Sequence, residues 1–200
     1  MYCSNILATN CIPFGFTVTL NRQSLVDSFS INYPDCTIIN GGLVISGDDI
    51  TNLNGLNVLI NIDNLSIVNN KLLENLIGLS SLKEAREIFI QRNIALENLN
   101  GLTSLISVKD YFYINDNPVI SNLNGLNELK DVGGDFLIQS NALLSDLNGL
   151  NSLYTVKTLY VNSNPSLINL HGLEALSFAD YLAIHDNSIV NLTGLSSIKN

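Results

Sequence analysis

The sequence predicts a mainly β protein, a right-handed solenoid with a single sheet of short parallel strands and an N-terminal strand-helix cap. Three observations predict this fold. A four-residue motif recurs along the chain, a short strand pattern lies between its copies, and a polar residue follows each strand at the same phase. Regular self-similarity with coils of ~23 residues is typical of repeat proteins whose units stack on one another.

The repeated motif is LxGL, in which x varies. Successive glycines of the motif are 23, 23, 24, 24, 23 and 22 residues apart, at Gly55, Gly78, Gly101, Gly125, Gly149, Gly172 and Gly194. Glycine tolerates a positive φ and the close approach of another backbone, so we expect each one at a crowded corner of a coil. The two leucines of each copy are expected to point inward, on the wall opposite the sheet.

Each coil is expected to contribute one strand. Ile88 and Ile90 flank Phe89, a two-residue step that predicts isoleucines facing the core and a phenylalanine facing solvent. The apolar residues that follow recur every three positions, which favours tight turns over a full α-helix. The outward strand centres are Val44, Ser66, Phe89, Tyr113, Leu137, Tyr160 and Ala183, and a large apolar residue flanks each on both sides.

A row of polar residues follows the strands. It comprises Asn70, Asn93, Asn117, Asn141, Asn164 and Asn187, with Asp48 at the same position of the first coil. The chain must turn there, and its backbone groups cannot all pair within the strand ladder. A buried asparagine supplies two donors and an acceptor for them, so we predict a structural role for the row.

Residues 1–35 are predicted to form an N-terminal extension and cap, and residues 36–200 a seven-coil solenoid that is truncated at its C-terminus. Residues 16–20 alternate like a short strand. Asn21 is expected to N-cap a helix whose apolar face includes Val26 and Phe29, together with Leu25. Such a cap would shield the leucines of the first coil from water.

The three cysteines, Cys3, Cys11 and Cys36, lie in the first fifth of the chain. Cys11 and Cys36 bracket the cap and enclose 24 residues, so we expect a disulfide between them and an unpaired Cys3. Three reduced thiols are the alternative. A disulfide favours an extracellular or cell-surface location, although the opening residues lack the charged and apolar segments of a signal peptide.

Composition limits the possible partners. The net charge is −9 and the nine basic residues are scattered, which argues against nucleic acid and anionic membranes. No apolar run approaches the ~20 residues that a membrane span needs. Histidine and cysteine do not occur at metal-ligand spacing, so we expect no metal and no cofactor. A monomer is expected unless the open C-terminal end associates.

The repeat pattern resembles a known family. Residues 85–93 fit the leucine-rich-repeat consensus LxxLxLxxN, and residues 36–62 resemble the opening of receptor L domains. Over residues 11–200 the chain is most similar to the L-domain-like repeats of bacterial secreted and cell-surface proteins of the Bacteroidetes type. Internalin-type repeats are a second likeness, with a stricter period. The resemblance implies the solenoid fold, but the cysteine-rich modules of hormone receptors are missing, so it does not imply hormone binding.

The exposed sheet face is the predicted binding surface. Its candidate residues are Phe89, Gln91, Tyr111, Tyr113, Asn115, Gln139, Tyr160 and Asn162. Rings supply apolar area and amides supply hydrogen bonds, which favours non-catalytic recognition or adhesion of a protein or glycan. Phe89 and Tyr113, on adjacent strands, are expected to form one ring platform.

Two alternatives remain open. A structural spacer would bind nothing, because β-propensity alone enriches strands in aromatic residues. A polysaccharide-processing β-helix enzyme would need clustered carboxylates. The charged residues predicted on the strand face are dispersed over several coils: Glu87, Arg92, Asp116, Asp135 and Asp186.

Overall fold

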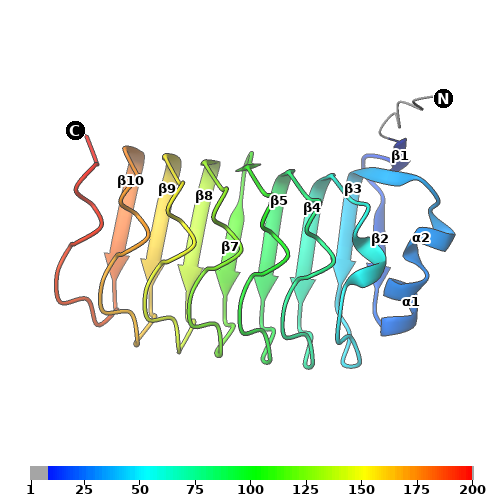
Figure 1. The fold of residues 1–200 in the computed structure, drawn as a ribbon, viewed down its shortest axis with the longest axis horizontal. Helices are drawn as coiled ribbons and strands as arrows, with labels where there is room; N and C mark the ends of the chain where they lie inside the picture. The colour runs from blue at the N-terminus through cyan, green and yellow to red at the C-terminus, as the bar shows by residue number, and fades with distance from the viewer. Residues whose placement is uncertain (1–8, 200) are drawn as a thin grey trace, which may run out of the picture.

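A single parallel sheet runs the length of the molecule in the computed structural model, which describes residues 9–199 (Figure 1). The coils contribute β3 (Cys36–Ile45), β4 (Asn61–Val68), β5 (Glu84–Gln91), β6 (Ser107–Val108), β7 (Phe112–Asn115), β8 (Asp131–Gln139), β9 (Thr155–Asn162) and β10 (Phe178–His185). Asn61 of β4 pairs with Glu84 of β5, 23 positions later, so each coil lies directly on its predecessor. The predicted β-solenoid is therefore confirmed.

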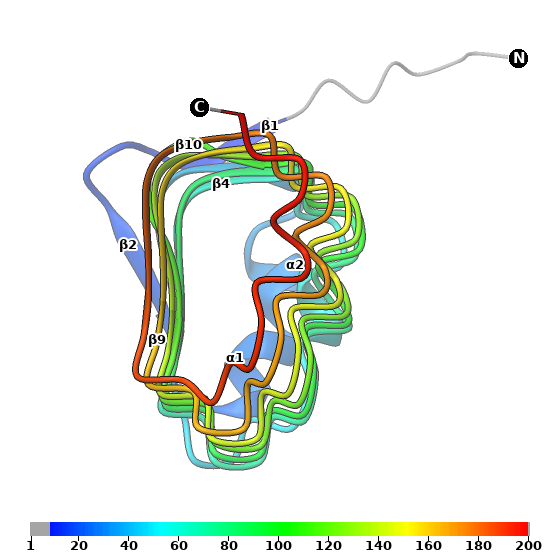
Figure 2. The same ribbon diagram turned by 90° about the vertical axis from the view of Figure 1, so that its left-hand side faces the viewer.

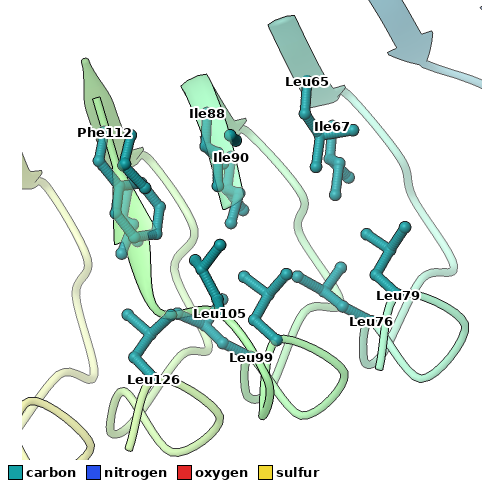
Figure 3. Close-up of a cluster of buried hydrophobic side chains, with 14 of the residues drawn as sticks. Leu65, Ile67, Leu76, Leu79, Ile88, Ile90, Leu99, Leu105, Phe112 and Leu126 are labelled. Carbon is teal, nitrogen blue, oxygen red and sulfur yellow. The ribbon is translucent and has the colours of Figure 1, made fainter. Parts of the chain in front are cut away.

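The register of the strands agrees with the sequence pattern. The seven predicted outward centres pair with one another from strand to strand, beginning with Val44 opposite Ser66 and ending with Tyr160 opposite Ala183. Their inward neighbours are fully buried, apart from half-buried Leu182 and Ile184 in the last described strand. Figure 3 shows these inward side chains facing the leucines of the LxGL wall.

The strands bend around a corner of the solenoid. In β4, Ile62 and Leu65 are both fully buried, while Asp63 and Asn64 between them face outward. Two consecutive outward residues interrupt the alternation of a flat strand and mark the bend. Viewed along the stack, the sheet consequently covers two sides of the coil (Figure 2).

The asparagine row has the predicted structural role. The Asn117 side chain accepts from the backbone N–H of Asn93 at 3.1 Å and donates to the carbonyl of Ile90 at 2.9 Å. The Asn117 N–H donates in turn to Oδ1 of Asn141 at 3.1 Å. The same pattern repeats from coil to coil, and five members are completely buried: Asn70, Asn93, Asn117, Asn141 and Asn164. We call this continuous series the asparagine ladder.

The first coil departs from the prediction. Gly47, and not Asp48, meets the ladder, because the Gly47 N–H donates to Oδ1 of Asn70 at 3.0 Å. Asp48 is exposed and pairs with Lys71 at 2.7 Å. In the later coils a residue with left-handed φ precedes each asparagine, at Asn69, Arg92, Asp116, Ser140, Ser163 and Asp186. The first coil has no such residue, so its backbone reaches the ladder one position earlier.

The LxGL glycines are required for two reasons. Gly101 has a φ of 121°, which disfavours any residue with a Cβ. A Cβ at this position would also overlap the carbonyl oxygen of Leu76 in the preceding coil. Gly55 and Gly78 lack the positive φ but are equally crowded by backbone. All seven lie close to another backbone: Gly55 against Val26 of the cap, and the other six against a leucine carbonyl of the preceding coil.

The N-terminal cap has a strand and two short helices. β2 (Thr17–Leu20) pairs with β3, and α1 (Gln23–Asp27) and α2 (Phe29–Asn32) follow, with the single-turn η1 (Asn54–Leu56) of the first coil packed against them. An additional strand, β1 (Thr9–Ile12), which we did not predict, also pairs with β3. Val26 and Phe29 are fully buried, as expected for a cap.

The N-cap prediction was wrong. Arg22, and not Asn21, occupies the N-cap position of α1, and no side chain of the cap residue bonds the helix. The Asp49 carboxylate from the next coil accepts from the Gln23 N–H instead, at 3.3 Å to each oxygen. A residue distant in the sequence therefore accepts the hydrogen bond of a free N–H at the start of α1, and the local sequence gives no sign of this contact.

The predicted disulfide joins Cys11 and Cys36, with 5.3 Å between their Cα atoms. A closed loop of this size stabilises a fold by ~3 kcal/mol in the chain-entropy model. Cys3 lies outside the described residues. Between residues 9 and 199, no helix is long and apolar enough to cross a membrane.

The asparagine ladder predicts unequal effects of two neighbouring substitutions. Asn117→Ala should lower the free energy of unfolding by ~1–3 kcal/mol, because buried backbone groups lose their partners. Asn115→Ala, two residues away on the outer face, should cost under about 1 kcal/mol. Urea denaturation of both variants measures the difference, and equal losses would contradict the structural role of the ladder.

The LxGL corner predicts a larger loss. Gly101→Ala should reduce stability by at least ~3 kcal/mol, because backbone strain and steric overlap act together. Gly15→Ala is a matched control, since Gly15 has a φ of 82° but nothing within 4 Å of an added Cβ. It should lose only ~1–2 kcal/mol. Similar melting curves for the two variants would mean that coil spacing does not constrain the corner.

Candidate functional site

The structure places the eight predicted site residues together on the outer face of the sheet. Phe89 lies on β5, Tyr113 on β7 and Tyr160 on β9, with Leu137 of β8 between the two tyrosines. Tyr111 precedes β7 and its ring is 5.9 Å from that of Tyr113. The candidate surface is therefore contiguous over strands β5, β7, β8 and β9.

The rings do not form one flat platform. Phe89 and Tyr113 have ring centroids 5.3 Å apart but an interplanar angle of 88°, so the edge of one ring meets the face of the other. This arrangement is favoured by the charge distribution of aromatic rings. A second pair, Tyr160 and Tyr181, has a centroid distance of 5.7 Å. The face thus presents two groups of rings separated by Leu137.

An amide row runs beside the rings. Gln91, Asn115, Gln139 and Asn162 occupy one register position on adjacent strands. Asn115 donates through Nδ2 to Asp116 at 3.0 Å. The Oδ1 atoms of Asn115 and Asn162 are covered by their neighbours and accept no hydrogen bond from the described residues. Such acceptors destabilise a fold unless water or a partner supplies a donor.

The aromatic group affects the acidity of Tyr113. Burial raises the pKa of its hydroxyl above the ordinary 10.0, and the negative charge of Asp135 contributes in the same direction. Smaller contributions come from Tyr111, Tyr160 and Glu87. At neutral pH the Tyr113 hydroxyl is consequently protonated and can donate a hydrogen bond to a partner.

A charged cluster at the corner of the sheet was missed by sequence reasoning. Arg86 donates through Nε to Asp63 at 2.7 Å and through Nη2 to Asn64 at 3.0 Å. Its Nη1 group pairs with Glu87 and with Asp110, the latter at 3.3 Å. The hydrogen bond with Asp63 raises the pKa of Arg86. The signal was available, because charges of alternating sign recur here at spacings of 23 and 24 residues.

The other charged residues of the face are placed apart from this cluster. Arg92 and Asp116 form a long pair at 3.8 Å on the turn after the strands. Asp186 contacts the ring Nδ1 of His185 at 2.8 Å. Among residues 9–199 no three histidine, cysteine, aspartate or glutamate side chains gather as a metal site requires.

We compared the chain with known proteins. Neither models of protein families nor curated proteins give a match. The geometry itself is that of a parallel β-solenoid compatible with an L-domain-like type.

The environment of Tyr113 predicts its pH dependence. Its pKa is raised in the fold, so its contribution to stability is complete below the ordinary pKa of 10.0 and is lost as pH rises through the raised value. NMR titration of labelled tyrosines, with Tyr113→Phe to assign the resonance, should give a midpoint above 10.0. The same titration in denaturant should return the ordinary value. A midpoint at or below it would contradict the packing described for this ring.

Proposed function

We propose that the chain is a non-catalytic extracellular recognition or adhesion module that binds a protein or glycan on its exposed sheet face. The observation that carries this proposal is the register of the two rows. Phe89, Tyr113 and Tyr160 share one register position on β5, β7 and β9, with Leu137 between them on β8, and an amide side chain lies two residues further along each of these four strands. Rings with adjacent amides are the combination that recognition surfaces use to bury apolar area and retain hydrogen bonds.

The scaffold supports the proposal through its rigidity. Neighbouring parallel strands hold their side chains ~4.8 Å apart, and the buried asparagine ladder fixes the turn that follows them. A surface that is already ordered loses little conformational entropy when it binds. Affinity can therefore arise from a modest number of contacts.

The chain is further proposed to be an L-domain-like, leucine-rich solenoid that lies outside the cell. The leucine and asparagine spacing of each coil supports a leucine-rich, L-domain-like type within the β-solenoids. The Cys11–Cys36 disulfide supports an oxidising environment, such as the cell exterior, because disulfides persist there.

A structural spacer is the second candidate. It is favoured by the contacts that the rings make with one another, since Phe89, Tyr111 and Tyr113 already cover part of each other's surface. In a spacer these contacts would serve only to stabilise the sheet, as cross-strand pairs commonly do. The two candidates differ in what the removal of one ring does to binding.

Tyr113→Ala separates the two functions. The variant should bind a partner more weakly by ~1–3 kcal/mol while its melting temperature changes little, as expected for a central ring on a rigid surface. Ligands are first selected on arrays of glycans and extracellular proteins and are then titrated by calorimetry. Tyr154→Ala is the matched control, because Tyr154 is half-exposed and lies beyond the corner of the sheet, against Phe178. Unchanged affinity in the Tyr113 variant would favour the spacer.

A further inference from the structure

The connection between β1 and β2 is an unusual part of the surface. Residues 13–16 stand out beyond the outline of the stacked coils, next to the outer face of the sheet (Figure 2). Phe14 and Phe16 in this connection are 79% and 66% exposed. Two phenylalanines at the tip of one short connection leave apolar area in water that a folded protein normally buries. We call residues 13–16 the overhang.

The overhang is held firmly at its base. The Cys11–Cys36 disulfide fixes β1, the strand that enters the overhang. Pairing with β3 fixes β2, the strand that leaves it. The Gly42 N–H donates to the Phe16 carbonyl at 2.8 Å. A Cβ on Gly41 would overlap that same carbonyl, so the overhang lies where only glycine permits it to lie. The two rings are therefore presented by a built structure.

Two hollows lie against the overhang. One, of about 370 Å³, lies between Phe16 and the sheet face and is also lined by Ser66, Glu87 and Phe89. The other, of about 700 Å³, is lined by Phe14, Asp63 and Arg86 together with Pro13 and Asn40. Both volumes fall in the range of small-molecule sites, about 300–1,000 Å³. Because Phe14, Asp63 and Arg86 line both, the hollows are neighbouring parts of one surface.

The polar groups of this surface are of mixed type. Arg86 donates to Oδ1 of Asp63 and to Oε1 of Glu87, and the Asn64 side chain donates to Oδ2 of Asp63 at 3.3 Å. Each carboxylate oxygen has two lone pairs, so both carboxylates keep capacity to accept hydrogen bonds from a ligand. The hydroxyls of Thr17 and Ser66 line the same hollow and can both donate and accept. A ligand rich in hydroxyl groups needs this mixture, because each of its hydroxyls donates one hydrogen bond and accepts others.

Charge argues for a neutral ligand. The guanidinium of Arg86 is surrounded by three carboxylates, so the corner carries a net charge of −2. The whole chain has a net charge of −9. The negative charge of the corner and of the whole chain would repel an acidic ligand. A cationic ligand would have to compete with Arg86 for the three carboxylates, and it would make no use of the hydroxyl donors.

We propose that the overhang and the adjacent sheet face form a binding site for a neutral glycan. The phenylalanine rings cover the apolar C–H faces of the sugars, and the carboxylates of Asp63 and Glu87 accept bonds from vicinal hydroxyls. Phe89 lies both in the hollow and in the aromatic row, so a glycan chain can continue from the overhang onto the sheet. This inference rests on the proposed recognition function and adds a ligand class and a second contact region.

The test uses an array of neutral, amino-bearing and acidic oligosaccharides, probed with the intact protein and its variants. The parent protein should bind neutral oligosaccharides. Phe16→Ala and the isosteric Glu87→Gln should each weaken that binding roughly tenfold. Thermal melting should stay close to that of the parent for Phe16→Ala, since the side chain is exposed. Tyr154→Ala should bind like the parent.

Two results would overturn the inference. Binding restricted to acidic or amino-bearing oligosaccharides, or none at all, would refute a neutral-glycan site. Neutral binding that Phe16→Ala and Glu87→Gln leave intact would remove the overhang from the site. If Tyr113→Ala then abolishes binding, the proposed recognition function stands without the overhang. If binding depends on Phe16 and not on Tyr113, the overhang is the site and the centre of the sheet is not.

Discussion

The hydrogen bonds of the buried asparagine ladder are the interaction on which the rest of the structure depends. Each asparagine binds the coil before it and the coil after it, so the spacing of the turns is fixed along the stack. That spacing brings backbone so close at the opposite wall that only glycine fits between the paired leucines. It also aligns the strands, because both ends of each coil are held. The register of the outward side chains is therefore set by these buried hydrogen bonds.

Much of the fold could be predicted because a solenoid repeats its local physics. The strand at Phe89 and the asparagine at position 93 obey the same rules as their equivalents in every later coil, so one unit determines the others. Prediction failed where the repetition ends. The N-terminus of α1 is met by Asp49 from another coil, and the first turn enters the ladder at Gly47. Both are tertiary contacts without a local sequence signal.

The outer surface was predictable only in part. Strand alternation placed the aromatic and amide rows, because alternation depends on the backbone alone. It did not place the cluster around Arg86, since that cluster requires the corner at which two consecutive residues face outward. Strand alternation also could not predict the angle between the rings of Phe89 and Tyr113, because side-chain rotamers depend on neighbours in three dimensions. The sequence period therefore predicted which residues face outward, whereas the ion pairs and ring contacts among them depend on packing in three dimensions.

The location of the only described disulfide has a mechanical consequence. It ties the capped end of the stack, while the coils near β10 are joined to their neighbours by hydrogen bonds and packing alone. Because each coil contacts only adjacent coils, a pulling force would separate them one at a time, beginning with coils far from the disulfide. Each released coil would lengthen the chain by roughly 80 Å at full extension. Under load, a solenoid built in this way would lengthen in steps while its disulfide-bonded end stays folded.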